Sequence, residues 1–207
     1  MSRAAVLILF AHPAFHKSLI NRRLAGAVRN LEGITFHDLY DRYPELDIDV
    51  EAEQQLLVAH DVLVMQHPFY WYSTPAILKE WQDLVLEHGW AYGQGGDALR
   101  GKILLSAITT GGREQAYQPS GYNRYTMRQL LAPLEQTAML CRMTYLPPFV
   151  VHGTHLLSEQ AVDQHAEDYR RLLLALRDRR IEPAQIPEIP RLNADLDRLL
   201  SADTLSD

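Results

Sequence analysis

The chain has 207 residues, a length that suits one α/β domain better than two. Its hydrophobic content of 47% and charged content of 22% are ordinary for a globular protein with a substantial core. The formal net charge of −6 provides no bulk attraction to nucleic acid, so we expect no nucleic-acid partner. The single cysteine, Cys141, excludes an intrachain disulfide and fits a reducing compartment, where we expect it to be a small buried residue.

The sequence carries no recognisable signal for insertion into a membrane. The residues after Met1 lead directly into an apolar, strand-like segment, without the pattern of a secretory signal peptide. No apolar run approaches the ~18–20 residues of a membrane-spanning helix. We therefore expect a cytoplasmic protein, which would reach a membrane only peripherally, through a partner or a surface contact on the cytoplasmic face.

The first part of the chain alternates between strand and helix patterns. Residues 4–11 form an unbroken apolar run, which is typical of a strand covered on both faces in a parallel sheet. Apolar residues at helical spacing predict a helix over 18–31. The alternation of apolar and polar residues predicts an edge strand over 34–39. A weaker helical pattern follows over 50–60.

The middle of the chain repeats this alternation. A second buried strand is expected over 61–66 and a third over 102–110. Between them lies the clearest helix, over 74–87, with Thr74 as the expected N-cap and Pro75 at the first helical position.

The last part of the chain begins with a helical pattern over 124–143. A weaker strand is expected over 144–152, with two prolines near its start, and a long helix over 158–180. The tail is different, because it carries three prolines and then a short amphipathic piece. It is either an arm that packs on a neighbouring subunit or a frayed end. We therefore divide the chain into a domain over 1–180 and a C-terminal extension over 181–207.

Alternating strands and helices predict right-handed crossovers and a parallel sheet with helices on both faces. Five expected strands favour a flavodoxin-like three-layer sandwich, with strand order 2-1-3-4-5, over the six-stranded dinucleotide-binding fold. In such sheets ligands bind outside the carboxyl ends of the strands, near the point where the strand order reverses. The loops that follow residues 11, 66 and 110 therefore form the candidate site.

The first of these loops runs from His12 to Asn21 and enters a helix. Unpaired N–H groups at a helix start attract anions, and Ser18 lies at the edge of this helix. His12 and Lys17 could add positive charge or hydrogen bonds to a phosphate. The alternative is that Ser18 only caps the helix while His12 satisfies local backbone groups.

The second loop contains four consecutive aromatic residues, Phe69, Tyr70, Trp71 and Tyr72. The loop is too short to bury all four in a core. A planar aromatic ligand would use such side chains as a wall, so their position at the end of a strand favours a binding role.

The third loop is a Thr-Thr-Gly-Gly turn formed by Thr109, Thr110, Gly111 and Gly112. Two glycines after a strand let the backbone approach a flat ligand closely, although many α/β proteins turn with glycines. Residues 93–98 also fit the G-x-G-x-x-A pattern, but a helix precedes them and a strand follows, the reverse of the dinucleotide fingerprint.

Other catalytic patterns are absent from the sequence. The nine histidines never take the H-E-x-x-H form, and a single cysteine makes no structural zinc site, so we expect no metal. There is no G-x-S-x-G nucleophile turn and no G-x-x-x-x-G-K-[ST] phosphate loop.

Taken together, the three loops resemble those of the NAD(P)H:quinone oxidoreductase family of flavodoxin-like flavoproteins. The chain is most similar to the bacterial ancillary proteins of glutathione-regulated potassium-efflux (Kef) systems, over roughly residues 5 to 180. The matching segments are AHP at 11–13, LYDRYPELDIDVEAEQ at 39–54, QHPFYWYSTPAILKEWQD at 66–83, HGWAYGQGG at 88–96, TTGG at 109–112 and CRMTYLPP at 141–148.

The resemblance implies a flavin cofactor, which is FMN in the Kef-type proteins and FAD in the larger quinone reductases. It implies that the phosphate side of the flavin is held by His12, Ser18, Leu19, Ile20 and Asn21. It also implies that residues 69–72 and 109–112 frame the flavin ring. By the same comparison, Trp90 and Tyr92 line the nicotinamide and quinone pocket, and Tyr117 lies near the pyrimidine edge.

One position departs from the family pattern. Where the quinone reductases have a histidine that balances charge on the reduced flavin, this chain has Asn123. Asparagine can form hydrogen bonds but cannot become cationic, which puts catalytic efficiency in question rather than flavin binding. The family also implies a homodimer with the site at the subunit interface.

Two functional hypotheses follow from these observations. In the first, the protein is an enzyme that transfers hydride from NAD(P)H through the flavin to a quinone-like acceptor, in a ping-pong scheme. In the second, it is a regulatory subunit of a potassium-efflux antiporter, with secondary or no redox activity. A flavodoxin-like scaffold that has lost its cofactor is a third alternative. The sequence leaves open NADH against NADPH and the identity of the acceptor.

Overall fold

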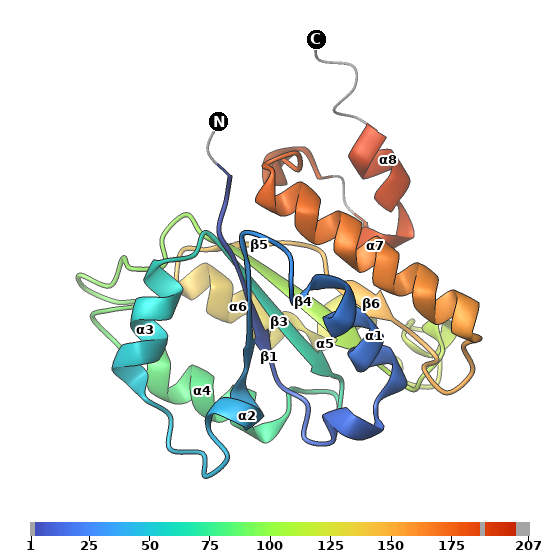
Figure 1. The fold of residues 1–207 in the computed structure, drawn as a ribbon, viewed down its shortest axis with the longest axis horizontal. Helices are drawn as coiled ribbons and strands as arrows, with labels where there is room; N and C mark the ends of the chain where they lie inside the picture. Colours follow the sequence, from blue (N-terminus) through green and yellow to red (C-terminus); the bar gives the residue numbers. More distant parts are fainter. Residues whose placement is uncertain (1–2, 187–188, 202–207) are drawn as a thin grey trace.

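The unbroken apolar runs of the sequence form the central strands of a parallel sheet. β1 (Val6–Phe10), β3 (Val62–Pro68) and β4 (Ile103–Thr109) are buried because helices cover both faces. β2 (Ile34–Asp38) pairs only with β1 among the described strands and so lies at an edge, as its alternating pattern predicts. In this computed structural model, which describes residues 3–186 and 189–201, the strand order is β2-β1-β3-β4-β5, which confirms the predicted flavodoxin-like topology (Figure 1).

The strand expected over 144–152 is divided into two short strands. β5 (Thr144–Tyr145) and β6 (Phe149–Val151) both pair with β4, which gives the described part of the chain a six-stranded sheet. Pro147 and Pro148 lie between them and have no N–H group to donate to the ladder, so pairing stops there and resumes after them.

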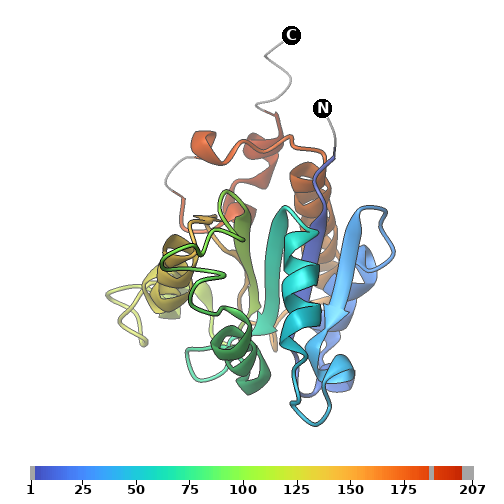
Figure 2. The ribbon, with the colours of Figure 1, turned by 90° about the vertical axis from the view of Figure 1, so that its left-hand side faces the viewer.

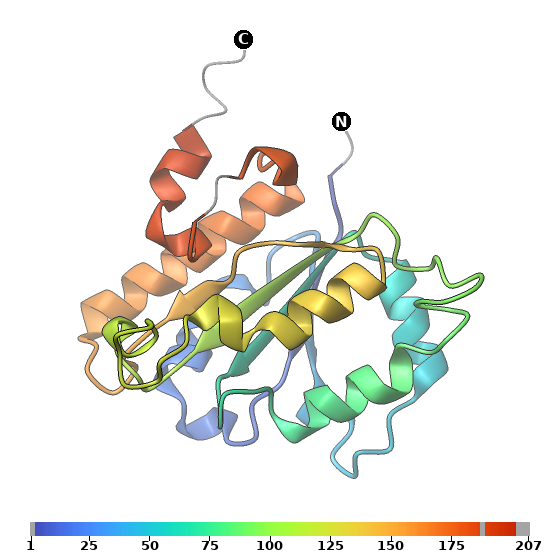
Figure 3. The same ribbon diagram turned by 180° about the vertical axis from the view of Figure 1, so that it is seen from behind.

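Helices form one layer on each face of the sheet. α1 (Leu19–Val28) and α7 (Glu159–Arg177) lie in front of the sheet in Figure 1. α3 (Val50–Val58), α4 (Ala76–Val85), α5 (Met127–Leu130) and α6 (Ala132–Leu140) cover the other face, seen in Figure 3. Each face of the sheet has its own buried apolar cluster. Cys141 is buried, as expected, in the cluster under α3 and α4. Figure 2 shows the layers edge-on.

Two helix predictions are wrong in detail. α4 begins at Ala76, so that Pro75 with its extended ψ of 152° is the N-cap and Thr74 lies outside the helix. The helix expected over 124–143 is two helices, α5 and α6, which meet at Leu131. Pro133 has no N–H group for the carbonyl four residues before it, so a continuous helix cannot pass through this point. A short helix after β2, α2 (Leu39–Arg42), was not expected.

A single carboxylate connects several elements of the α3–α4 face. Glu53 on α3 is 1% exposed, and its Oε2 accepts a hydrogen bond from Trp81 Nε1 at 2.8 Å. Its Oε1 accepts from the Tyr43 hydroxyl at 2.6 Å and lies 2.7 Å from His37 Nε2. Burial alone would raise the pKa of Glu53, but the hydrogen bonds from these three side chains outweigh it and lower the pKa. Glu53 thereby ties α3 to β2, to α4 and to the segment after α2.

The described part of the C-terminal tail packs on its own chain. Ile181, Leu192 and Leu196 are buried in the cluster on the α1–α7 face, and α8 (Leu196–Ser201) is the last described element of the tail. The division of the chain at residue 180 stays a prediction. Among the helices of the described residues, none combines the length and the apolar character needed to cross a bilayer.

Candidate functional site

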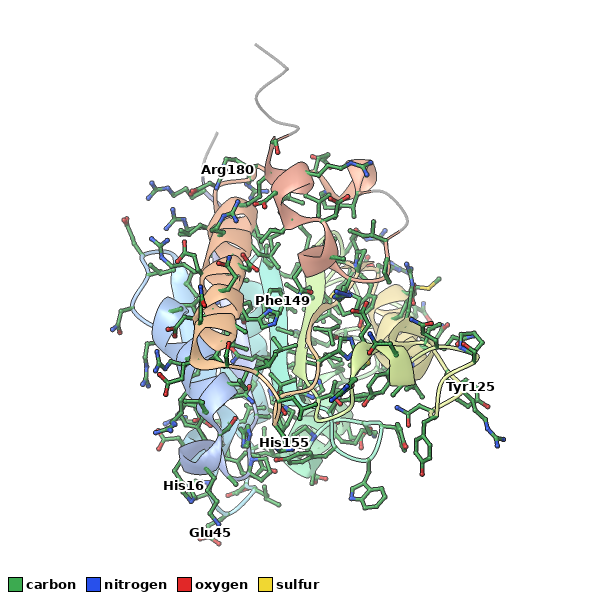
Figure 4. The ribbon with its side chains drawn as sticks, turned by 90° about the vertical axis from the view of Figure 1, so that its right-hand side faces the viewer. His16, Glu45, Tyr125, Phe149, His155 and Arg180 are labelled. Atoms are coloured by element: carbon green, nitrogen blue, oxygen red, sulfur yellow. The ribbon has the colours of Figure 1, made fainter. Side chains whose placement is uncertain are left out.

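The carboxyl ends of β1, β3 and β4 meet around a cavity of about 300 Å³. This volume is at the lower end of the roughly 300–1,000 Å³ that small-molecule pockets occupy. The loops after β1, β3, β4 and β6 line it, and Figure 4 shows His155 among these loops at the lower end of the sheet. The candidate site therefore lies where the strand order reverses, as predicted.

Asn21 connects the first loop to the third. Ser18 is the N-cap of α1, and its Oγ accepts hydrogen bonds from the backbone N of Asn21 at 3.2 Å and from Asn21 Nδ2 at 3.1 Å. The same Nδ2 donates to Thr109 Oγ1 at 3.0 Å. Asn21 Oδ1 is buried and has no partner among the described residues. An unpaired buried acceptor costs about 1–3 kcal/mol, so a ligand hydroxyl or N–H group would find a ready partner here.

His12 contributes a hydrogen bond rather than a positive charge. Its ring is 6% exposed, and its Nδ1 accepts from the backbone N of Ala14 at 3.1 Å. Burial lowers the pKa of His12, although a backbone hydrogen bond opposes this. The ring is therefore neutral at pH 7, with its proton on Nε2, and Lys17 is the cation of this loop.

Leu19 and Ile20 are not among the residues that line the cavity. The Leu19 side chain is 41% exposed, and Ile20 is buried in the core beside α7. Both residues belong to the first turn of α1, where N–H groups have no intrahelical acceptor and point toward the cavity end of the sheet. Ser18 caps the helix and also lines the cavity, and His12 accepts a hydrogen bond from a local backbone group. Phosphate binding by this loop therefore stays a prediction, beside the alternative that these residues serve only local structure.

The aromatic loop is divided between the cavity and the solvent. Phe69 and Tyr70 line the cavity, and the ring of Tyr70 lies 6.1 Å from that of His12. Tyr72 donates its hydroxyl hydrogen to Asn123 Oδ1 at 3.1 Å, while Trp71 is 94% exposed. Trp71 and Tyr72 both have left-handed backbone, with φ of 49° and 63°. Strain of this kind, about 1–2 kcal/mol for each residue, concentrates at functional sites.

The third loop is held by Tyr117. Thr110 Oγ1 lies 2.5 Å from the Tyr117 hydroxyl and accepts from the backbone N of Gly112 at 3.3 Å. A Cβ on Gly111 would lie 3.1 Å from the His155 ring, and one on Gly112 would lie 2.9 Å from the Tyr117 ring. Both glycines are therefore closely packed without an unusual backbone angle, and at Gly112 an added Cβ would force the Tyr117 ring to shift.

The sequence analysis missed Thr154 and His155, which line the cavity from the loop after β6. The backbone N of Thr154 donates to the carbonyl of Thr110 at 3.1 Å, so this loop is attached to the third one. The sequence could have predicted this loop, because the fifth expected strand, over 144–152, also ends at the carboxyl edge of the sheet.

Trp90 and Tyr92 lie at the opposite end of the sheet from the cavity. α4 carries the chain from the carboxyl end of β3 back to the amino end of β4, and both residues lie in the connection between α4 and β4 (Figure 1). They are partly buried against the core of the α3–α4 face. The structure thus brings together the predicted residues of the three loops with Tyr117 and Asn123, and leaves Trp90 and Tyr92 apart within one chain.

A larger cavity of about 710 Å³ lies at the amino end of the strands, but Asp61, Lys102 and Arg179 in its wall already have protein partners. Arg179 pairs with Asp61 at 3.5 Å, and Lys102 Nζ donates to the carbonyls of Val58 and His60 at 3.1 and 2.6 Å. The cavity at the carboxyl end has the unpaired acceptor and the aromatic wall, so it is the better candidate.

His67, just before the aromatic loop, should make stability depend on pH. It is fully buried, its Nδ1 donates to the Pro68 carbonyl at 3.0 Å, and burial lowers its pKa to about 4. Between pH 6.5 and 4 the unfolded chain binds a proton that the folded chain excludes, so the free energy of unfolding falls as the pH falls. From pH 7 to 5 this group should contribute a loss of about 2 kcal/mol, which His67→Gln should remove.

Urea denaturation of the two proteins at pH 8, 7 and 5 tests this expectation. Between pH 8 and 7 the imidazole is mostly neutral in both states, so both proteins should change in the same way. Equal losses for the two proteins between pH 7 and 5 would show that His67 is not held neutral by the fold.

Comparison with known proteins shows the family to which the chain belongs. The family model for the flavodoxin-like fold matches residues 4–173. The glutathione-regulated potassium-efflux system ancillary protein KefG of Pectobacterium carotovorum subsp. carotovorum (strain PC1) is 49% identical over 164 residues, which cover 79% of this chain and 90% of that protein.

Two solved structures are similar in both fold and sequence. General stress protein 14 of Treponema denticola in complex with FMN has a TM-score of 0.79 and 41% identity, over 83% of this chain and 98% of that one. An NADPH-quinone reductase from P. pentosaceus has a TM-score of 0.75 and 33% identity, over 83% and 97%. The chain therefore belongs to the flavodoxin-like family, together with the KefG ancillary proteins.

Proposed function

We propose that this protein is a flavin-dependent NAD(P)H:quinone oxidoreductase with FMN as its cofactor. The observation that carries the proposal is one cavity that combines a helix start, an unpaired buried acceptor on Asn21 and an aromatic wall. The FMN bound to the Treponema denticola protein and the activity named for the P. pentosaceus protein support it.

The residues of the cavity fit the parts of FMN. The first turn of α1 and Lys17 would hold the phosphate, because N–H groups and a cation stabilise an anion. Asn21 Oδ1 would accept a hydrogen bond from a ribityl hydroxyl. Phe69, Tyr70 and the backbone of residues 109–112 would frame the ring. We choose FMN over the larger FAD because FMN is bound in the Treponema denticola protein.

The chemistry that a flavin supplies when bound is two-electron transfer, in which hydride is taken from NAD(P)H and passed to a quinone-like acceptor in turn. The residues of the protein would orient the flavin and its substrates and stabilise the charge that develops on the flavin. Thr110 fixes the Tyr117 hydroxyl through a 2.5 Å hydrogen bond, which holds a polar group at the edge of the cavity. Asn123, held by Tyr72, would offer hydrogen bonds there without positive charge.

The proposal includes a homodimer. Trp90 and Tyr92 lie away from the cavity within one chain, so a role in binding nicotinamide or quinone requires a second copy to supply them. The exposed Trp71 is part of the surface beside the cavity that such a partner would meet.

The similarity to KefG supports a further proposal, that the protein acts beside a potassium-efflux antiporter as its partner. In the adaptor alternative this is its main role and redox activity is secondary or absent. A pure adaptor has no need of the strained aromatic loop or the closely packed Gly111 and Gly112, which is why we prefer the enzyme.

An absorbance spectrum of the purified protein tests the proposed function. We expect flavin bands that bleach when NADPH is added without oxygen and return when a quinone is added. The same titration with NADH compares the two donors. A colourless protein that also fails to take up added FMN would contradict the enzyme hypothesis and favour the adaptor hypothesis.

A further inference from the structure

The C-terminal tail, which lies beyond the family match at residue 173, contacts the candidate site through β6. Asn193 Nδ2 donates to the carbonyl of Val150 at 2.9 Å, and Asn193 Oδ1 accepts from the backbone N of Val150 at 3.0 Å. The backbone N of Leu192 donates to the carbonyl of Pro148 at 2.9 Å. The amide of Asn193 therefore occupies the place that a residue of a neighbouring strand would take.

β6 needs this partner because of its position. It has only three residues, a pair of prolines precedes it, and β4 supports it on one side. Peptide groups of successive strand residues point to opposite sides, so those of Val150 point away from β4. Val150 is 1% exposed, and without Asn193 its N–H and C=O groups would be buried and unpaired.

β6 in turn holds the third loop of the candidate site. The backbone N of Thr110 donates to the carbonyl of Val151 at 2.9 Å. The backbone N of Gly153 donates to the carbonyl of Gly112 at 3.0 Å. The Asn193 side chain is thus connected to the Thr-Thr-Gly-Gly turn through β6, which it holds at Val150 and which is hydrogen-bonded to the turn at Val151 and just after it at Gly153.

A second route runs through side chains. Arg191 pairs with Glu114, which lies in the short helix directly before Tyr117. Ile189 and Pro190 line, together with Tyr117, a cavity of about 470 Å³ between the tail and the segment that follows the third loop. The tail thus bounds the space into which Tyr117 would move if it left Thr110.

We propose that residues 189–193 are a positioning segment, which holds β6, the third loop and Tyr117 in the arrangement that the flavin needs. The inference rests on the proposed function, because it assumes that the cavity binds FMN. It assigns to the tail a role inside its own subunit, and it makes Asn193 the central residue of that role.

The test compares full-length variants that differ in this contact. Asn193→Ala should weaken FMN binding about tenfold and speed amide hydrogen exchange in residues 110–117 and 149–154, because Val150 loses both partners. At saturating FMN it should also shift the visible band of the bound flavin, since groups at the ring edge move. Asn193→Asp keeps the acceptor but sets a carboxylate oxygen opposite the Val150 carbonyl oxygen, so we expect an effect at least as large as that of Asn193→Ala.

Arg198→Ala is the control, because Arg198 lies in the same tail with a side chain that is 72% exposed. It should match the wild type in FMN affinity, exchange and flavin spectrum. Wild-type FMN affinity and spectrum in Asn193→Ala would overturn the inference, even if that variant melts at a lower temperature. Failure of the wild type itself to bind FMN would instead contradict the proposed function, and unchanged exchange in residues 110–117 of Asn193→Ala would then overturn the inference independently.

Discussion

Replacing Glu53 by leucine should lower the free energy of unfolding by about 3–5 kcal/mol, the largest effect that we expect from a single substitution in this chain. The carboxylate is 1% exposed and has three side-chain partners. Leucine would leave Trp81 Nε1 and the Tyr43 hydroxyl buried without an acceptor. Urea denaturation at pH 7 measures the change.

A matched pair of variants separates burial from charge. Glu53→Gln should cost less than Glu53→Leu, because an amide oxygen still accepts a hydrogen bond, and Glu51→Gln on the exposed side of the same helix should cost little. The folded pKa of Glu53 lies below its unfolded value, so its contribution is complete above about pH 4.3 and is lost as the pH falls through the folded pKa. A loss below about 1 kcal/mol in Glu53→Leu would show that this network is not a principal support of the fold.

Replacing Gly112 by alanine should weaken FMN binding between tenfold and a hundredfold, on the order of 1–3 kcal/mol. The added Cβ would lie 2.9 Å from Tyr117 Cε2 and from the Tyr117 hydroxyl, too close for the ring to stay in place. Tyr117 would have to move toward the tail and give up its 2.5 Å hydrogen bond with Thr110. Quenching of FMN fluorescence on titration measures the affinity.

Gly26→Ala is the matched control for this substitution. Gly26 lies in α1, and among the described residues no heavy atom lies within 4 Å of a Cβ built on it. The variant should keep the wild-type FMN affinity and gain about 0.5–1 kcal/mol of stability from helix propensity. Wild-type affinity in Gly112→Ala would mean that the packing of Tyr117 against the third loop does not support the cofactor.

The sequence predicts the centre of the fold well because burial leaves a direct mark on it. β1, β3 and β4 are covered on both faces, so their residues are apolar without interruption and are recognised as strands. The site follows from them, because parallel strands that end at one edge bring their loops together. Pro133 and the Pro147–Pro148 pair also carry a local signal, and giving their missing N–H groups more weight would have placed the breaks correctly.

Other features depend on contacts that no local pattern contains. Asn193 and Val150 are 43 residues apart in the sequence, and neither an asparagine nor a valine at these positions predicts that the two are hydrogen-bonded. Glu53 is hydrogen-bonded to His37 and Trp81, and the three residues lie on three different elements. A helical pattern alone would instead predict that this glutamate lies at the surface. Trp90 and Tyr92 are aromatic residues in a loop, and only the path of α4 shows which end of the sheet they reach.

The closure of β6 by Asn193 also bears on how copies of this chain can associate. An open strand offers unpaired backbone groups to any other chain, and this is a common route to domain swapping and aggregation. Here the peptide groups of Val150 are already satisfied within the subunit, which removes that template. A second chain therefore finds no free peptide group at Val150, and a substitution that removes Asn193 would present these two groups for pairing with another chain.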